Sequence, residues 1–233
     1  MDGMTQKARE GYGGTGAGPI TPDGSAVEHW LRLPPGPEPG IVADAVPGGG
    51  TLLELGCGVG RLTGPLTEAG FRVTAVDESA AMLEHVREAR TVCSPIESLD
   101  LGGERFDVVL LASFLVHNGD PRVREGLLRT CRRHVAENGW VLIQRERASW
   151  RDQEVREASL PGGGLVRVAA IEPAGPDLTS VLVEYAYPDA RWTQRFLSYG
   201  YPGDTFEEAL AAAGLAIDAY LTEDRTWLRA RPV

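Results

Sequence analysis

The 233-residue chain is poor in cysteine, and its charge is predominantly of one sign. Three cysteines, Cys57, Cys93 and Cys131, are too few and too scattered for a disulfide framework or a four-ligand zinc site, and we expect no metal. Lys and Arg number 23 against 33 Asp and Glu, which gives a net charge of −10. Because a protein that grips a polyanion needs a basic surface, the composition argues against nucleic acid as a partner.

Long apolar runs are also missing. The most apolar stretch, Val108 to Val116, is far shorter than the roughly 20 residues that span a bilayer. The first 14 residues are polar and rich in glycine, and they lack the apolar core of a signal peptide. We therefore expect a cytoplasmic protein with reduced cysteines and no membrane contact.

Glycine and proline are concentrated at the start of the chain, where they make up 19 of the first 50 residues against 26 of the remaining 183. This change predicts a boundary near residue 50. Residues 1–50 would form either a flexible tail or a lid that docks over a site through apolar residues such as Trp30 and Leu31. After this segment we predict a cofactor-binding core over 51–147, an antiparallel cap over 148–203, and a final helix with edge strands over 204–233.

Strands and helices alternate through the predicted core. Strands are predicted over 51–55, 71–76, 106–112 and 140–144, with helices at about 60–69, at 79–90 and from residue 121. Asp120 and Pro121 are typical of the start of the last helix, and Asn138-Gly139 predicts a turn before the last strand. Alternation on short loops predicts a parallel sheet that is covered by helices on both faces.

Beyond Arg147 the pattern becomes that of an antiparallel meander. Extended segments at 165–171, 181–187 and 191–199 are separated by Pro, Gly and Asp turns. Asp204 and Glu207 form a capping-box pattern that opens a helix over 206–213, and two last strands are predicted over 215–221 and 227–230. The predicted fold is therefore α/β, with a doubly wound, mostly parallel sheet and a small antiparallel β cap.

Residues 52–79, LLELGCGVGRLTGPLTEAGFRVTAVDES, contain the motif that carries chemistry. A strand runs into Gly56, Gly58 and Gly60, which let a ligand approach the backbone, and the following helix begins with unpaired N–H groups. Asp77 ends the next strand 21 residues after Gly56, where a carboxylate can accept both hydroxyls of a ribose. The pattern predicts a nucleoside-type cofactor at the carboxyl edge of the sheet.

The glycine spacing distinguishes between cofactors. A dinucleotide fingerprint requires G-x-G-x-x-G/A, whereas the third glycine here comes one residue early and Arg61 takes the place of the small residue. Glu54, two residues before the first glycine, suits a cationic or amine-bearing ligand and would repel a pyrophosphate. The segment resembles the class I S-adenosylmethionine (SAM)-dependent methyltransferases, whose first motif is E/D-x-G-x-G-x-G with an acid ending the second strand. An NAD-binding oxidoreductase is the alternative.

The resemblance implies a fold, a cofactor and a set of site residues. It covers residues 51–144, and the final helix and strands fit the reversed edge hairpin of the family's seven-stranded Rossmann-like sheet. The three glycines would line the methionine and ribose of SAM, and Asp77 would hold the ribose hydroxyls. The other residues that it places around SAM, or around the product S-adenosylhomocysteine, are Glu78 and Met82 beside the adenine, Ile96 and Glu97 at the adenine edge, Leu111 at the end of the fourth strand, and Tyr12, reaching the cofactor carboxylate from a folded-over lid.

Two histidines are candidates for a catalytic base, which is needed only if the attacking oxygen or nitrogen must lose a proton. His117 follows the fourth strand, at the carboxyl end where such sheets bind ligands, and is the first candidate. His29, in the predicted lid, is the second. His85 and His134 are predicted to lie on solvated helix surfaces.

The acceptor is expected to be a small organic molecule. The D/N/S-P-P-Y/F motif of enzymes that methylate adenine, cytosine or glutamine is absent, since the chain reads Ser113-Phe114-Leu115 after the fourth strand. In similar methyltransferases an aromatic meander like that of 148–203 covers the acceptor and also forms a homodimer interface. We predict methyl transfer from SAM to an O or N of a small molecule, with natural-product biosynthesis as the role suggested by the Gly-, Ala- and Arg-rich composition. The alternative is a SAM-binding protein of this fold with non-methylating chemistry or a regulatory role.

Overall fold

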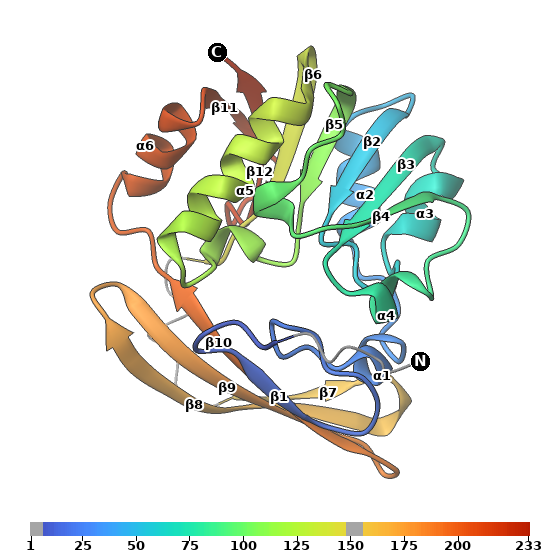
Figure 1. Ribbon diagram of the computed structural model, residues 1–233, viewed down its shortest axis with the longest axis vertical. Helices are drawn as coiled ribbons and strands as arrows, with labels where there is room; N and C mark the ends of the chain where they lie inside the picture. The colour runs from blue at the N-terminus through green and yellow to red at the C-terminus, as the bar shows by residue number, and fades with distance from the viewer. Residues whose placement is uncertain (1–6, 148–155) are drawn as a thin grey trace.

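The computed structural model describes residues 7–147 and 156–233. The molecule is built around two β-sheets, one above the other in Figure 1. The larger sheet has seven strands in the order β11-β12-β6-β5-β2-β3-β4, and the smaller has five in the order β1-β10-β9-β8-β7. This is the predicted α/β architecture with a separate antiparallel sheet.

The seven-stranded sheet is parallel except at one edge. Strands β2 to β6 pair in parallel, whereas β12 runs antiparallel to both of its neighbours. The central strand β5 is buried on both faces, which accounts for the unbroken apolar run Val108–Leu111 that ends it. The strands are β2 (Gly50–Leu55), β3 (Phe71–Asp77), β4 (Arg90–Cys93), β5 (Phe106–Leu111), β6 (Val135–Gln144), β11 (Leu215–Tyr220) and β12 (Trp227–Pro232).

Helices cover both faces of this sheet, as doubly wound folds require. On one face lie α5 (Pro121–His134) and α6 (Thr205–Ala212), and on the other lie α2 (Glu38–Ala45) and α3 (Thr63–Glu68). The predicted start of α5 is confirmed, because the Asp120 side chain accepts the Arg122 N–H at 2.8 Å. The two apolar layers hold the carboxyl ends of the strands in fixed relative positions.

Two predicted boundaries in the core are wrong. The helix predicted over 79–90 is only the short α4 (Ala80–Leu83), and Glu88 has a left-handed φ of 60° that no helix continues through. The turn predicted at Asn138-Gly139 lies inside β6, opposite a register shift in β5. A Cβ atom at position 139 would lie 2.8 Å from the Asp107 carbonyl oxygen, so glycine here permits close strand approach instead of a turn.

Two side-chain predictions are also wrong. Asp204 makes no capping hydrogen bond at the start of α6, so the predicted capping box does not form. His134 is fully buried at the end of α5, where its Nδ1 lies 3.1 Å from the Glu104 carbonyl oxygen. The charged neighbours of His134 in sequence point elsewhere on the helix, which sequence spacing alone did not resolve.

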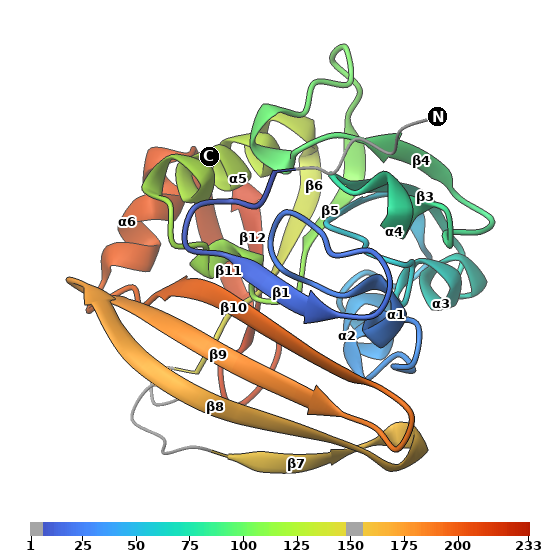
Figure 2. The same ribbon diagram turned by 60° about the horizontal axis from the view of Figure 1, so that its bottom comes forward.

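The five-stranded sheet is antiparallel throughout (Figure 2). Its strands are β1 (Gly13–Gly16), β7 (Glu157–Leu160), β8 (Gly164–Gly175), β9 (Leu178–Ala186) and β10 (Arg191–Tyr199), with the short helix η4 (Pro161–Gly163) between β7 and β8. The predicted meander forms β8, β9 and β10. Residues 1–6 of the predicted N-terminal segment and 148–155 of the predicted cap lie outside the described residues.

The N-terminal segment crosses between the two sheets. Its strand β1 pairs with β10, and the following helix α1 (Val27–Trp30) packs on the five-stranded sheet. The Trp192 Nε1–H donates to the Ala17 carbonyl oxygen at 2.8 Å, which fixes the loop after β1. We refer to residues 7–26 as the strap. No helix in the described part of the chain is long and apolar enough to cross a membrane.

Candidate active site

A cavity of about 440 Å³ lies where the carboxyl ends of the parallel strands meet the strap and the five-stranded sheet. The core contributes its glycine turn and the loops after β3, β5 and β6, and the small sheet contributes residues of β9 and β10. Ten of the thirteen predicted site residues line this cavity: Tyr12, Glu54, Gly56, Gly58, Asp77, Glu78, Met82, Ile96, Glu97 and His117. Gly60, Leu111 and His29 do not, although a sequence neighbour of each does, namely Val59 and Arg61, Ala112 and Trp30.

The glycine turn after β2 is tied to β3 through its backbone. The N–H groups of Gly56 and Cys57 both donate to the Val76 carbonyl oxygen, at 2.8 and 2.9 Å. Gly56 has a φ of +75°, and a Cβ atom there would lie 2.4 Å from the Leu115 side chain. Gly60 closes the turn by donating to the Cys57 carbonyl oxygen at 3.0 Å. The turn therefore presents bare backbone to the cavity.

Asp77 links the glycine turn to the loop after β3. Its Oδ2 accepts the Gly58 N–H at 2.9 Å, and its Oδ1 accepts the Ser79 N–H at 2.8 Å. Burial raises the pKa of Asp77 to about 6 in spite of these hydrogen bonds. The carboxylate is thus oriented at the cavity wall with lone pairs remaining on both oxygens.

Glu54 is a buried carboxyl group beneath the same turn. Its Oε2 accepts a hydrogen bond from the Thr63 hydroxyl at 2.6 Å, and burial raises its pKa to about 7. Thr63, in the first turn of α3, was not predicted as a partner. Glu54 therefore adds negative charge to the cavity wall when it is ionised.

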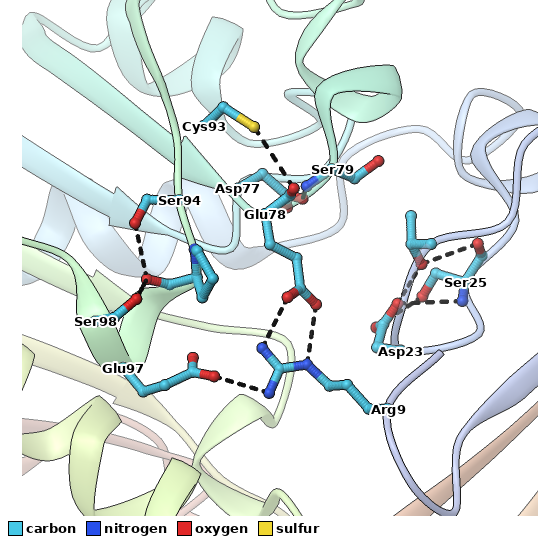
Figure 3. A network of polar contacts seen from close by, with 12 residues as sticks. Arg9, Asp23, Ser25, Asp77, Glu78, Ser79, Cys93, Ser94, Glu97 and Ser98 are labelled. Atoms are coloured by element: carbon cyan, nitrogen blue, oxygen red, sulfur yellow. Dashed lines mark hydrogen bonds and ion pairs between the residues drawn. The ribbon is translucent and has the colours of Figure 1, made fainter. Parts of the chain in front are cut away.

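Arg9 of the strap bridges two of the predicted acidic residues (Figure 3). Its guanidinium donates to both oxygens of Glu78, at 3.1 and 2.8 Å, and lies 2.9 Å from Glu97. Although burial alone lowers it, the hydrogen bonds to these carboxylates raise the pKa of Arg9 above its ordinary value. Sequence reasoning missed Arg9, because nothing in the polar, glycine-rich head marks one arginine as a partner of distant loops.

Tyr12 fixes the strap on the other side of the cavity. Its hydroxyl donates to the Leu197 carbonyl oxygen at 3.1 Å and accepts the Gly119 N–H at 2.9 Å. The strap therefore contacts both the core and β10, and Arg9 and Tyr12 hold it across the cavity. This is a docked segment, which the sequence left open against a flexible tail.

His117 has both ring nitrogens on main-chain partners. Its Nε2 accepts the Glu146 N–H at 2.9 Å, so Nδ1 carries the proton and donates to the Tyr199 carbonyl oxygen at 2.7 Å. The ring thus joins the helical turn η2 (Leu115–His117) to the end of β6 and to β10. This arrangement favours a structural role for His117 over the predicted role as a base.

His29 lies behind the cavity wall. Its ring stacks on Tyr185 with centroids 3.8 Å apart, and Tyr185 in turn lines the cavity. Burial, together with the charge of Arg32, lowers the pKa of His29 to about 4. The structure therefore does not bring this second predicted base to the cavity.

The part of the cavity facing the five-stranded sheet is lined by polar groups that the sequence did not single out. Asp23 of the strap accepts hydrogen bonds from Thr21 and from the N–H and hydroxyl of Ser25, the latter two at 3.2 and 3.0 Å. The Gln194 amide donates to the Ser25 hydroxyl at 2.9 Å, which connects β10 to this loop. We refer to this region as the acceptor side.

Negative charge predominates around the cavity. Within the described ranges its lining includes two arginines, Arg9 and Arg61, and Arg61 pairs with Glu38 at 3.1 Å. Both arginines are therefore engaged by carboxylates of the same wall. The lining carboxylates are seven, namely Asp23, Glu38, Glu54, Asp77, Glu78, Glu97 and Glu146. Such a cavity favours a cationic ligand over an anionic one.

Comparison with known proteins places this site in context. Residues 53–143 match the family model described as a methyltransferase domain. The chain is 36% identical over 104 residues to a ubiquinone biosynthesis O-methyltransferase of Methylobacterium sp. (strain 4-46), covering 41% of this chain and 39% of that protein. A protein of the same name from Bradyrhizobium diazoefficiens is 31% identical over 112 residues, with 45% and 43% covered. The chain thus spans about two fifths of the length of these curated relatives.

Solved structures share the fold over most of the chain. The CcbJ methyltransferase of Streptomyces caelestis has a TM-score of 0.72 at 20% identity, covering 89% of this chain and 96% of that one. The SAM-bound amino pentose methyltransferase CalS10 of Micromonospora echinaspora has a TM-score of 0.67 at 20% identity, covering 84% and 90%. At this level of identity the likeness is one of fold.

Proposed function

We propose that the protein transfers the methyl group of SAM to an oxygen or nitrogen of a small organic molecule, because residues 53–143 match a methyltransferase domain. The observation that carries the proposal is the cavity itself. It brings the glycine turn and Asp77 together with side chains of the strap and of the five-stranded sheet.

The residues of the cavity wall fit SAM. The backbone at Gly56 is exposed where a side chain would collide with Leu115, and Asp77 offers acceptor oxygens to a ribose. The excess of carboxylates suits the positive sulfonium. When bound, SAM supplies an electrophilic methyl group. The protein's own contribution is to hold the two reactants in line and to exclude water.

The acceptor would lie between the glycine turn and the five-stranded sheet. The strap and β10 close this side, so we propose a small molecule instead of a nucleic acid or a protein chain as the partner. The relatives include named O-methyltransferases and an amino pentose methyltransferase, so their names favour neither oxygen nor nitrogen. We also propose that the exposed face of the five-stranded sheet forms a homodimer interface, which ultracentrifugation would test.

Calorimetric titration of the purified protein with SAM, S-adenosylhomocysteine and NADH tests the cofactor. We expect binding of the first two and none of NADH. Release of S-adenosylhomocysteine in the presence of an acceptor panel then tests the reaction, and mass spectrometry of the product identifies a gain of one methyl group. Binding of NADH alone would overturn the proposal. SAM binding with no methyl transfer to any acceptor would instead favour a regulatory SAM-binding protein.

A further inference from the structure

The acceptor side of the cavity contains a carboxylate that no cation neutralises within the described chain. None of the ion pairs among residues 7–147 and 156–233 includes Asp23. The side chain is oriented by hydrogen bonds from Thr21 and Ser25, all of them neutral donors. These hydrogen bonds therefore hold the carboxylate in a fixed orientation in the cavity wall.

Asp23 lines the cavity from the strap, in a loop that hydrogen bonds join to Gln194 of β10. Burial is the main cause that raises the pKa values of Asp77, Tyr12 and Tyr185, and the charge of Asp23 also raises each of them. Asp77 ends β3, Tyr12 belongs to the strap and Tyr185 belongs to β9. Asp23, Asp77 and Glu78 all line the cavity space, and Figure 3 shows the Asp23 loop apart from the other two residues, on a different segment of the chain. A ligand that filled this space would contact Asp23.

An exposed aromatic ring lines the same cavity. Phe114 is 43% exposed and is the one aromatic side chain among the exposed large apolar residues of the described chain. Ser113 and Phe114 both have left-handed backbone, with φ of 54° and 59°, and Gln144 holds this turn by accepting the Ser113 N–H at 2.8 Å. The strained backbone of this turn thus keeps the Phe114 ring out of the core. Ring faces attract cations.

We propose that the acceptor is a protonated amine, which pairs with the Asp23 carboxylate and lies against the Phe114 ring. The inference rests on the proposed function and makes the protein an N-methyltransferase. The ammonium group gives one proton to Asp23. The nitrogen lone pair then forms the new N–C bond while the methyl C–S bond of SAM breaks, and its electron pair returns to sulfur as S-adenosylhomocysteine. An alcohol would leave Asp23 without a cationic partner.

Matched amines and alcohols test the acceptor class. The pairs are D-glucosamine with D-glucose and 2-phenylethylamine with 2-phenylethanol, each incubated with protein and SAM while S-adenosylhomocysteine release is followed. We expect turnover of amines only, with N-methylated product by mass spectrometry. Comparable turnover of an alcohol, or of no amine by protein that binds SAM, would overturn the inference. Absence of SAM binding, measured by calorimetry on the same sample, would instead refute the proposed function itself.

Variants test the two named residues. We expect Asp23→Asn to weaken amine binding about ten- to a hundredfold, the range for hydrogen bonds to charged groups, in calorimetric titration with and without S-adenosylhomocysteine. SAM affinity, titrated separately, should fall by a smaller factor than amine affinity. Asp44→Asn makes the same change on the exposed face of α2 and serves as the control. Unweakened amine binding in Asp23→Asn would refute the pairing.

Phe114→Leu keeps apolar bulk but removes the ring face, whereas Phe114→Tyr keeps the ring. Loss of a cation–π contact corresponds to roughly two- to thirtyfold weaker amine binding, and we expect this in the leucine variant alone. Equal amine affinity in the leucine and tyrosine variants would show that the ring does not contact the cation.

Discussion

Replacing Arg9 with alanine should loosen the strap. The side chain makes three charge-assisted contacts with Glu78 and Glu97, and its own exposed fraction is 22%. A hydrogen bond to a charged group contributes about 1.5–3 kcal/mol, and partial exposure reduces the sum because solvent screens the pairs. We take about 2 kcal/mol as the loss, which corresponds to roughly a thirtyfold rise in the population with an open strap.

Hydrogen exchange followed by mass spectrometry measures this opening without any ligand. The informative amides are those of Tyr12 and of β1, since they lie beyond Arg9 in the strap. We expect their exchange to become faster by about the same factor in Arg9→Ala. Arg90→Ala removes an arginine that contacts both oxygens of Glu104 on the core surface and should leave the strap unaffected. Unchanged exchange in Arg9→Ala would refute a closing role for this cluster.

Three further outcomes are expected. Asp77→Ala should weaken SAM binding by about 1.5–3 kcal/mol in calorimetry, because its carboxylate is the oriented acceptor at the glycine turn; unchanged affinity would contradict a ribose contact. His117→Leu should lower the free energy of unfolding by about 3 kcal/mol in urea, since it leaves the Glu146 N–H and the Tyr199 carbonyl unpaired, and a wild-type midpoint would contradict this. Burial lowers the pKa of His29 to about 4 from 6.5, so the folded state binds fewer protons between these values. Its contribution to stability is complete above pH 6.5 and is lost as pH falls toward 4, and His29→Phe should remove that part of the pH dependence.

Local sequence patterns were sufficient to predict the parallel core and the residues at the carboxyl edge of its sheet. Glycine spacing and the acid that ends β3 identified Gly56 and Asp77, and alternation of strands with helices predicted the parallel pairing of the core strands. The strap was not predictable in this way. Arg9 contacts Glu78 and Glu97, which lie 69 or more residues away, and Asp23 lines a cavity assembled from three segments. Neither arrangement leaves a periodic pattern in the sequence. The contacts of His117 were not predictable for a similar reason, because its ring is held by main-chain groups that any sequence could supply.

Strand β1 joins two parts of the chain that both lie outside the match to the methyltransferase family model. The methyltransferase family model ends at residue 143, whereas Asp23, Tyr185 and Gln194 lie on the strap and on strands inserted between β6 and α6. Because β1 pairs with β10, these two distant stretches form one unit, which Arg9 and Tyr12 join to the loops of the parallel sheet. Under the proposed function, this unit and Phe114 of the methyltransferase domain together line the space for the acceptor, so a change of acceptor draws on both parts of the chain.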